Sequence, residues 1–532
     1  MNKEKITKIY LLNVPLENDY KNTLYFTSIE DQQSYFQSRI VDSLTLDDSS
    51  YQRKDKYIRY PKGYDELYKC NYVMYQNKAY SNKWFYAFIT DLEYINDELT
   101  YIHIETDVMQ TWMFDYQIKS SFVEREHVSD DTVGLHTVPE NVETGDLIVN
   151  NKIAGRSFTS WIIIVGATVD LGDDSFPDVI GTNMNNVYSG LRYYSFTSED
   201  TLNSVLKSVA KAGKSDAITS IFMGSNQFFQ TEAIEGKAFF RVKSVEGTPT
   251  ATWSVASLGG TNITPISKPT KLDNYEPKNK KLLTFPYSYL MASNNNGSNA
   301  IYKYERFSSS ECDFRYIGTV CPGMSIRLQP LNYNNQEVNN EEGLNLGKLP
   351  VCAWTNDVYT NWLTQNSVNI ACSIGSSLLT IAGGAAMAGS GAGALMGAQT
   401  AMSGALGIAS SIGQVYQMSL TPPQAEGNVN CGDAQYSAGL ANIIMYQMSI
   451  KSEYARIIDE YFTAYGYKVN RFKVPNKAHR SRWWYTKTLE INIDGGIPAK
   501  DMEKIKSCYN NGITFWRNAN EINDYSLSNV IV

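Results

Sequence analysis

The residue types that build metal sites and disulfide frameworks are scarce and scattered in this sequence. The chain of 532 residues has 4 histidines and 7 cysteines, and no two cysteines form a Cys-x-x-Cys pair. The cysteines are Cys70, Cys312, Cys321, Cys352, Cys372, Cys431 and Cys508, and the histidines are His103, His127, His136 and His479. This spacing argues against a disulfide framework and against a zinc site. We therefore expect no bound metal and no cofactor.

The sequence also lacks the signatures of an exported chain and of a nucleotide-binding loop. Its start, MNKEKITKIYLLN, has neither the apolar core nor the cleavage site of a signal peptide, so we expect synthesis in a cytoplasm. Gly213–Ser215 spells GKS, but Ser208 stands where a phosphate-binding loop needs its first glycine. A helical pattern precedes this GKS, where a phosphate-binding loop requires a strand. We interpret the match as coincidence.

No arrangement of catalytic residues stands out, and we expect no enzyme activity. The GSGAG at residues 389–393 lacks the glycine order of a nucleophile elbow, because Ala388 occupies the first position. Glu124–His127 reads Glu, Arg, Glu, His, and could supply acid and base groups. On a strand these side chains alternate between faces, so we interpret them as a solvated or interface edge.

Excess positive charge is absent, which argues against a protein that grips nucleic acid by its phosphates. The net charge is −8 and the isoelectric point is near 5.3. One basic and aromatic stretch near the end could bind single strands by charge and stacking. In an acidic protein we favour a solvated face or a subunit contact for it. Its residues are Lys468, Arg471, Lys473, Lys477, Arg480, Arg482, Trp483, Trp484 and Tyr485.

Aromatic residues are abundant, and their pattern favours a β-rich protein. The chain has 37 tyrosines, and aromatic side chains suit strands and interfaces. Lys83–Asn96 and Leu99–Phe114 form the best hairpin candidate, joined through Asp97 and Glu98. In the second segment Ile102 and Ile104 alternate with polar residues, the period of a half-buried strand.

Further periodic segments predict a few helices among many strands. Ile29–Phe36 is a short helix candidate. The helices with apolar periodicity or favourable ends are Asp200–Ala212, Ile443–Gly466 and one that begins near Pro498 and ends at residues 510–512. The remaining strand candidates are Ser160–Gly172, Phe239–Val245, Leu489–Ile493 and Ile513–Asn518.

One long segment has no charged residue and no histidine at all. From Val358 to Ala425 the chain contains no Asp, Glu, Lys, Arg or His, although 19 % of the whole chain is charged. Ile370–Ala388 would extend for about 28 Å as a helix, close to the bilayer core of about 30 Å. Residues 389–393 could be a hinge, and Ala394–Tyr416 a second helix of similar length. Pro422 and Pro423 end the segment.

A small residue recurs at every fourth position in this apolar segment. Such a row lets helix backbones approach closely in lipid or in a crowded protein channel. If the row marks one continuous helix, there is no hinge, and the sequence leaves both arrangements open. The small residues are Ala385, Gly389, Gly393, Gly397, Ala401, Ala405, Ala409 and Gly413.

Three interpretations of the apolar segment remain open at this point. A buried core hairpin would normally show larger residues and a polar outer face. A disordered Gly/Ala/Ser linker would contain fewer large aliphatic residues. A membrane-active segment that stays out of lipid until it is triggered fits best, because Gly and Ser gain too little in lipid for a permanent anchor. The predicted lipid-facing residues are Ile370, Ile374, Leu378, Leu379, Ile381, Leu395, Met396, Leu406, Ile408 and Ile412.

Both ends of the chain resemble one protein family. The resemblance rests on VPLENDYKNTLYFTS (Val14–Ser28), the aromatic-rich stretch Asn82–Val128, Ser452–Asn476, and YNNGITFWRN (Tyr509–Asn518). These segments resemble the tail knob, or distal tail tube, proteins of small short-tailed phages that infect Gram-positive bacteria and replicate their DNA by protein priming. The family pattern includes a long Gly/Ala-rich apolar insertion, as in residues 358–425.

The resemblance implies a mainly β protein with a few helices (α+β), in a multi-domain subunit of a hexameric tail tube. We expect an N-terminal tube domain at 1–145, an outer knob domain at 146–300, and a discontinuous second tube domain at 301–357 and 428–532. The apolar loop would occupy 358–427. Six such loops would plug the channel, then emerge and perforate the host cytoplasmic membrane when the genome is ejected.

The expected partners follow from the same resemblance. They are five further copies of the chain, other tail proteins such as the lower collar or tail tube, the host cytoplasmic membrane, and phage DNA that passes without sequence-specific binding. The expected location is the distal tail of the virion. Two other functions remain as alternatives: a free pore-forming protein, which would need export, and a tail-tip enzyme that degrades cell wall.

Overall fold

A computed structural model describes most of the chain outside the apolar segment. The residues it describes are 7–46, 57–77, 81, 83–154, 161–179, 183–184, 187–188, 190–225, 231–242, 265–295, 297–318, 325–335, 343–348, 351–352 and 442–532. Both predicted sets of residues in the apolar segment, the lipid-facing set and the small row, therefore lie outside the described residues.

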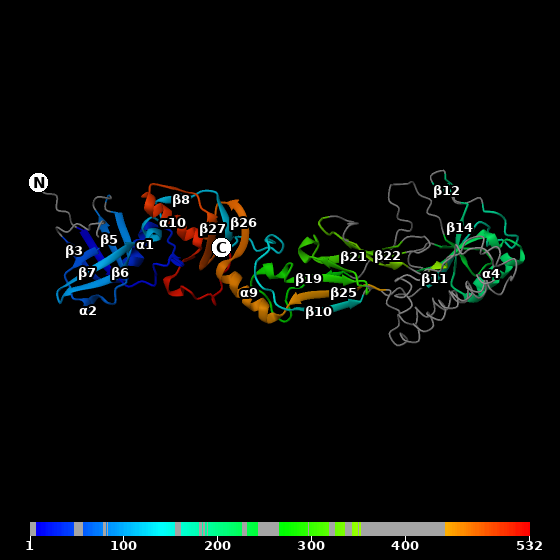
Figure 1. The fold of residues 1–532 in the computed structure, drawn as a ribbon, viewed down its shortest axis with the longest axis horizontal. Helices are drawn as coiled ribbons and strands as arrows, with labels where there is room; N and C mark the ends of the chain where they lie inside the picture. Colours follow the sequence, from blue (N-terminus) through cyan, green and yellow to red (C-terminus); the bar gives the residue numbers. More distant parts are fainter. Residues whose placement is uncertain are drawn as a thin grey trace, which may run out of the picture. The chain divides into compact units, whose positions relative to one another are not determined.

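The chain divides into two compact units, and both are built from discontinuous segments. Unit 1 contains residues 1–146, 274–284 and 451–532, and unit 2 contains residues 147–273 and 285–450. In Figure 1 the blue N-terminal and red C-terminal segments belong to unit 1, and most of the green segments belong to unit 2. The predicted second tube domain is thus shared between the units, and the division into tube and knob domains stays a prediction.

The first sheet of unit 1 is antiparallel and six-stranded. Its strands, in spatial order, are β3 (Ile40–Leu46), β1 (Thr7–Leu12), β5 (Tyr72–Asn77), β6 (Lys83–Asn96), β7 (Leu99–Thr106) and β4 (Tyr57–Tyr60). Two short helices connect them, α1 (Ile29–Gln37) and α2 (Tyr64–Leu67). The Ser28 hydroxyl caps α1 by accepting the Asp31 N–H, and Phe36 on this helix is fully buried. The predicted short helix at Ile29 is confirmed.

The predicted hairpin is present, but its second strand is shorter than expected. β6 pairs with β7 in antiparallel register, and Ile102 and Ile104 are buried as the alternation predicted. The strand ends at Thr106 because the Asp107 carboxylate accepts the N–H groups of Met109 and Gln110. This N-cap starts the short helix α3 (Val108–Thr111), so the prediction of strand as far as Phe114 is wrong.

The second sheet of unit 1 joins the two ends of the chain. Its strands, in spatial order, are β2 (Asn22–Leu24), β29 (Ile513–Trp516), β27 (Trp483–Glu490), β9 (Ser121–Glu126) and β26 (Tyr467–Lys473). Two further strands, β8 (Tyr116–Ile118) and β28 (Ile493–Gly495), pair in a small sheet of their own. In the sequence β8 precedes β9, and β28 follows β27. The strand predicted at Leu489–Ile493 begins earlier, at Trp483, because β27 pairs with both β29 and β9.

The longest helix candidate, Ile443–Gly466, forms a strand in its first part and a helix in the rest. Residues 444–450 form β25 (Ile444–Ile450), which pairs on both sides with strands of unit 2. The helix α9 (Ser452–Tyr465) begins only after Lys451, in unit 1. Hydrogen bonding to two neighbouring strands outweighs the helical periodicity of residues 443–450, so that part of the prediction is wrong. The helix predicted after Pro498 is confirmed as α10 (Ala499–Asn511), and Pro498 is its N-cap residue.

Unit 2 contains a pair of four-stranded sheets that share one core. The first sheet has the order β10 (Leu147–Ala154), β25, β19 (Ser288–Ser293) and β20 (Asn299–Tyr302). The second has the order β18 (Ile266–Ser267), β21 (Glu311–Gly318), β22 (Ser325–Leu331) and β23 (Leu344–Lys348). Buried side chains from both sheets, such as Leu290, Met445, Phe314 and Leu328, lie in the same hydrophobic cluster.

A six-stranded sheet covered by a helix completes unit 2. The order is β16 (Thr231–Ala233), β17 (Phe240–Val242), β14 (Arg192–Phe196), β11 (Trp161–Ala167), β15 (Ile218–Ser225) and β24 (Val351–Cys352). A two-stranded ribbon, β12 (Asn183–Met184) with β13 (Val187–Tyr188), follows β11 in the chain. The helix α4 (Glu199–Lys211) buries Leu202, Leu206 and Val209, as its periodicity predicted.

The Gly-Lys-Ser sequence lies directly after α4, so a helix precedes it as predicted. The Gly213 N–H donates to the Ala210 carbonyl at 3.0 Å, and Gly213 has a φ of +70°. The Lys214 Nζ donates to the Phe176 carbonyl at 2.6 Å. Both residues therefore end a helix and anchor a loop, which is the structural role of an ordinary helix terminus. The short 3-10 helix η2 (Ser215–Ala217) follows.

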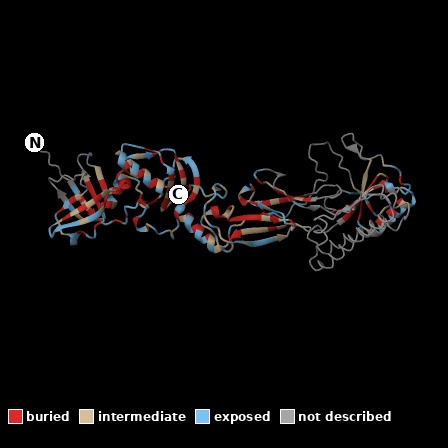
Figure 2. Ribbon diagram, viewed as in Figure 1, coloured by how far each residue is buried: buried red, intermediate tan, exposed pale blue. Residues whose placement is uncertain are grey.

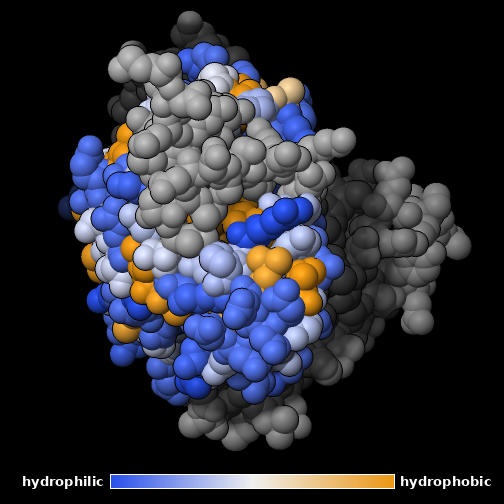
Figure 3. Space-filling view, turned by 90° about the vertical axis from the view of Figure 1, so that its left-hand side faces the viewer, coloured by the Kyte–Doolittle hydropathy of each residue, from blue (hydrophilic) through white to orange (hydrophobic). Residues whose placement is uncertain are grey.

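Three further 3-10 helices are η4 (Lys280–Leu283), η5 (Tyr304–Arg306) and η6 (Ala519–Glu521). Buried residues, red in Figure 2, occur in the strands of both units, alternating with half-buried ones on β7 and forming continuous runs on β29. The face shown in Figure 3 is mostly hydrophilic, with small separate hydrophobic spots.

Among the described residues, no helix has the length and hydropathy needed to cross a membrane. The expectation of a mostly β, multi-domain protein with few helices is confirmed.

Candidate functional site

The structure describes the whole of the basic and aromatic stretch predicted near the C-terminus. β26 carries Lys468, Arg471 and Lys473, and β27 begins with Trp483, Trp484 and Tyr485. These strands lie on either side of β9, the strand that ends in Glu124, Arg125 and Glu126. The antiparallel ladders thus bring the predicted acidic and basic segments together, although they are far apart in the sequence.

The alternation predicted that Glu124–His127 lies on a solvated or interface edge of a sheet, and the structure contradicts this prediction. β9 lies inside the sheet, and Arg125, Glu126 and His127 are buried, with exposed fractions of 8 %, 1 % and 5 %. Glu126 is held by the Lys473 ammonium at 2.5 Å and by the Asn476 N–H at 2.8 Å. Burial of a charge in this way requires a partner of opposite charge, which β26 supplies.

A second buried carboxylate, Glu140, organises the neighbouring loop. Its side chain is completely buried, and it forms ion pairs with Arg125 and Lys281. It also accepts the backbone N–H of Lys468 at 2.9 Å. Burial lowers the pKa of Lys281, and the nearby Glu140 opposes that shift. The loop, η4 and β26 are therefore fixed to β9 by one ionic cluster.

His127 is locked in its neutral form. Its Nδ1 accepts the Tyr485 N–H at 2.8 Å, so Nε2 carries the proton and donates to the Thr463 carbonyl at 3.0 Å. Burial, with the positive charges of Arg480 and Arg125, lowers the pKa of His127 to about 3. Both ring nitrogens are hydrogen-bonded, and the ring carries no charge at neutral pH. His127 therefore positions strands and does not transfer protons.

Most of the basic and aromatic residues also have structural partners. The Arg480 guanidinium donates to the Val128 carbonyl at 2.9 Å, and Arg482 forms an ion pair with Glu521. Trp483 is fully buried and donates from Nε1 to the Thr463 carbonyl, while Trp484 stacks on Phe515 with ring centroids 5.4 Å apart. These rings are not free to stack on nucleobases. A solvated face or subunit contact therefore describes only part of the predicted set.

Three residues of the predicted basic set, Lys468, Arg471 and Lys473, line a cavity beside β26. The cavity has a volume of about 200 Å³ and lies between β26 and the segment 128–138. Its polar lining residues are Glu126, Ser129, Asp130, His136, Lys468, Arg471, Lys473 and Asn476. Within the described parts of the chain, neither Lys468 nor Arg471 forms a salt bridge. We call this feature the basic cavity.

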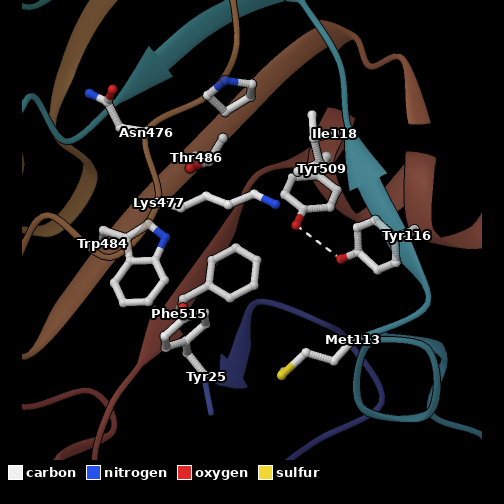
Figure 4. Close-up of a pocket in the computed structure, with 11 residues that line it drawn as sticks. Tyr25, Met113, Tyr116, Ile118, Asn476, Lys477, Trp484, Thr486, Tyr509 and Phe515 are labelled. Atoms are coloured by element: carbon white, nitrogen blue, oxygen red, sulfur yellow. Dashed lines mark hydrogen bonds between the residues drawn. The ribbon is translucent and has the colours of Figure 1, made fainter. Parts of the chain in front are cut away.

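A second, smaller cavity has aromatic walls (Figure 4). It encloses about 50 Å³, and Tyr25, Trp484 and Phe515 line one side. Tyr116 and Tyr509 lie across from them with their hydroxyl oxygens 3.1 Å apart. The Lys477 side chain extends between the two groups, and desolvation lowers the pKa of its ammonium. The volume is suited to one small side chain or a few water molecules.

The helix α9 presents an apolar row to the outside of unit 1. Ile457, Tyr461 and Tyr465 follow one another at intervals of four residues, and their exposed fractions are 64 %, 36 % and 40 %. On the same helix Asp459 is buried and accepts the Tyr275 hydroxyl at 2.7 Å. The helix is therefore attached to unit 1 by its polar and apolar inner face.

No cluster of metal-ligating side chains occurs in the described segments.

Comparison with known proteins identifies what kind of chain this is. The family model for the C-terminal domain of the tail knob protein gp9 of Bacillus phage phi29 matches residues 255–530. This chain belongs to that tail knob family. A second model, for the N-terminus of caudoviral major tail proteins, matches residues 5–117. The resemblance seen in the sequence is confirmed.

Full-length relatives support the assignment. The chain is 27 % identical over 595 aligned positions to the tail knob protein gp9 of Bacillus phage phi29, covering 98 % of this chain and 97 % of the relative. It is 25 % identical to the tail knob protein gp9 of Bacillus phage B103, with the same coverage. The solved structure of the tail knob protein gp12 of bacteriophage C1 has the same fold, with a TM-score of 0.60, 15 % identity and coverage of 99 % and 100 % of the two chains.

Membership in the tail knob family makes the protein a structural component of a phage tail. It also implies association with other tail proteins of the virion. The buried ionic cluster fits this role, because it fixes the strands of unit 1 to one another. Glu140 and the basic cavity are among the features that sequence reasoning missed. Glu140 lies in a loop, outside any helix or strand, so no periodicity marks it.

Proposed function

We propose that this tail knob protein assembles as a homo-hexamer around a channel through which the genome is ejected. The proposal is supported by the family membership and by the β-rich units, whose discontinuous segments suit a rigid tube wall. DNA would pass without sequence-specific binding. The net charge of −8 in each copy agrees with this, since a negative wall repels phosphates.

The observation that carries the rest of the proposal is the charge-free run from Val358 to Ala425. We infer that six such segments close the channel before infection and afterwards perforate the host cytoplasmic membrane. The lipid-facing residues from Ile370 to Ile412 would enter the bilayer. The small row from Ala385 to Gly413 would allow close helix packing both in the channel and in lipid.

The domain roles complete the proposal. Residues 1–145 would line the tube, 146–300 would broaden the knob, and 301–357 with 428–532 would form a second tube segment. The protein would be made in the host cytoplasm and carried at the distal end of the tail. Its neighbours there would be the lower collar or tail tube proteins.

Dye release from liposomes tests the membrane role. The intact protein is compared with a variant in which residues 369–419 are replaced by a Gly/Ser linker of equal length, across a range of pH. The linker keeps the two flanking segments connected and removes only the apolar side chains. Leakage from the intact protein alone supports the proposal.

The other outcomes of the liposome experiment contradict it in different ways. Leakage from neither protein would reduce the segment to a channel plug, and the perforating activity would belong elsewhere in the virion. Equal leakage from both proteins would assign the activity to another part of this chain. Negative-stain images of both proteins show whether each still forms rings, so that a loss of leakage is not confused with a loss of assembly.

A further inference from the structure

The smaller cavity of unit 1, which we call the aromatic cavity, contains an ammonium group without a counter-ion (Figure 4). Lys477, in the loop between β26 and β27, extends into it and forms neither a hydrogen bond nor a salt bridge in the described part of the chain. No carboxylate occurs among the described residues of the lining. A positive charge that leaves water needs a partner of opposite charge, and none of these residues supplies one.

The Lys477 side chain is arranged in the reverse of the usual way. A long cationic side chain normally lays its stem on apolar surface and keeps its charge in water. Here the residue as a whole is exposed, whereas its ammonium end is desolvated among aromatic rings. That desolvation lowers the pKa of Lys477, and no negative charge opposes the shift. Because an exposed residue forms part of its wall, the cavity can be reached by small solutes.

Two tyrosine hydroxyls in the same cavity provide a spare hydrogen-bond donor. The hydroxyl oxygens of Tyr116 and Tyr509 lie 3.1 Å apart, so one hydroxyl donates to the other. Two hydroxyls carry two protons and this bond uses one, and neither has a further partner in the described part of the chain. Burial raises the pKa of Tyr116 to about 12, so the pair stays protonated at neutral pH. One O–H is therefore available to an acceptor.

The other polar group of the lining is already engaged. The Asn476 side-chain oxygen accepts the Lys473 ammonium at 2.9 Å, and its nitrogen donates to the His127 carbonyl at 3.1 Å. The cavity thus has donors in excess of acceptors.

The aromatic walls are fixed and carry a second positive charge. Trp484 stacks on Phe515, and Tyr25 meets Trp484 edge-on with ring centroids 4.9 Å apart. The Arg517 guanidinium lies 5.7 Å from the centroids of both the Tyr25 and the Trp484 rings. It donates to the carbonyls of Arg480 and Ala478, and forms no salt bridge within the described residues. These surroundings favour an anion over a cation.

We propose that the aromatic cavity binds one small monovalent anion, such as chloride, between the Lys477 ammonium and the Tyr116–Tyr509 hydroxyl pair. A volume of about 50 Å³ accommodates an ion of roughly the size of a water molecule, which takes about 30 Å³ in the liquid. Apolar walls disfavour a dianion such as sulfate, which costs more to remove from water. The ion would join the loop 474–482 to β8 and α10, and the inference is independent of the channel and of the apolar segment.

The line width of the chloride NMR signal tests binding to the full chain. Sodium gluconate keeps the ionic strength constant, because gluconate is too large for the cavity. Wild type should broaden the signal saturably, and formate, but not sulfate, should displace the chloride. Lys477→Met keeps the length of the side chain but removes its charge, and should weaken this binding at least about tenfold. Lys487→Met is the matched control, since Lys487 on β27 is paired with Glu124 at 2.9 Å, and should behave as wild type.

A variant without the tyrosine hydroxyls tests the second half of the site. Tyr116→Phe and Tyr509→Phe are combined, because either hydroxyl alone would still have a proton to donate. The double variant retains Lys477 and should bind chloride at least about threefold more weakly than wild type.

Hydrogen exchange gives a local measurement of the same site. An ion that binds only the closed cavity slows its opening, by roughly tenfold at a chloride concentration ten times the dissociation constant. Peptides that cover residues 474–482 and α10 should show this protection in wild type and lose it in Lys477→Met. Peptides from β1 and β5, in the other sheet of unit 1, should exchange at the same rate with and without chloride.

The opposite results would overturn the proposal. Undiminished broadening with Lys477→Met would mean that chloride binds elsewhere on the chain, and displacement by sulfate would contradict the proposed charge and size of the ligand. Wild-type protein whose exchange at residues 474–482 ignores chloride would also refute the site. Near-ultraviolet circular dichroism shows whether Lys477→Met keeps its tryptophan packing. If it does not, the double tyrosine variant decides, and unchanged affinity in that variant would contradict the site.

Discussion

The ammonium of Lys473 lies 2.5 Å from the carboxylate of Glu126, and only 1 % of the Glu126 side chain is exposed. The two residues stand on adjacent strands, β26 and β9, that come from opposite parts of the sequence. The pair therefore joins the N-terminal and C-terminal parts of unit 1. Most of the chain between these two parts forms unit 2, which is a long insertion into unit 1.

The first prediction concerns this pair. Glu126→Gln should leave the Lys473 ammonium without its counter-charge at a largely buried site, and should lower the free energy of unfolding by about 1–3 kcal/mol. Hydrogen-exchange mass spectrometry of peptides covering β9 and β26 measures the effect locally. Glu503→Gln, which breaks an exposed pair with Lys506, is the control and should change stability by less than about 0.5 kcal/mol.

A glycine next to the ionic cluster yields the second prediction. Gly466 ends α9 with a φ of +65°, and a Cβ there would lie 2.2 Å from the Glu126 carbonyl oxygen. Its own carbonyl accepts the Arg125 guanidinium at 2.6 Å. With a ψ of −155°, this backbone conformation is essentially restricted to glycine and costs another residue about 1–3 kcal/mol. Gly466→Ala should therefore destabilise unit 1 by more than that backbone cost alone.

The matched control for Gly466 is Gly213, at the end of α4. It has a φ of +70°, but nothing lies within 4 Å of the position its Cβ would take. Gly213→Ala should cost only the backbone term, about 1–2 kcal/mol. Urea unfolding of both variants, followed by near-ultraviolet circular dichroism, gives the comparison. Equal losses would mean that the contact with Glu126 relaxes without strain.

The third prediction uses the pH dependence of His127. Its pKa in the folded protein is about 3, below the ordinary value of 6.5. As the pH falls, the unfolded chain therefore binds a proton first, so this group's contribution to stability is complete above about pH 6.5 and is lost towards pH 3. Between pH 7.5 and pH 5, wild type should lose about 2 kcal/mol more than His127→Gln. Urea unfolding at the two pH values measures the difference, and His479→Gln, an exposed site, should behave as wild type.

Several elements were predictable because a local signal and the tertiary structure agree. Ile102 and Ile104 alternate in the sequence and are buried on β7, and Leu202, Leu206 and Val209 form one face of α4. Pro498 and Gly512 mark the two ends of α10. In each case the spacing of a few neighbouring residues decides the structure.

The other elements depend on partners that are distant in the sequence. Residues 443–450 have a helical spacing, but β10 and β19 hydrogen-bond to both edges of β25 and make it a strand. Glu126 reads as a solvated residue until Lys473, on another strand, is seen beside it. The basic cavity has no local signature either, because its lining comes from two segments that only folding brings together.

The last prediction concerns the apolar segment, which lies outside the described residues. Leu379→Asp and Leu406→Asp each place a carboxylate among the proposed lipid-facing residues, at a cost of about 2.5–3.5 kcal/mol at the centre of a bilayer. Virions carrying either variant should assemble in normal numbers, yet deliver their genomes poorly. Leu489→Asp is the matched control, because Leu489 is already 61 % exposed on β27 and lies outside the charge-free run.

Particle counts and plaque counts from the same preparations separate assembly from delivery. A fall in plaques at constant particle number for the two segment variants, with little change for Leu489→Asp, is the expected result. Potassium efflux from infected cells should fall in the same two variants, because a perforated cytoplasmic membrane loses ions. Normal plaque counts and normal efflux for both would remove the membrane role from this segment, since a carboxylate in the bilayer core opposes insertion whichever way the helices pack.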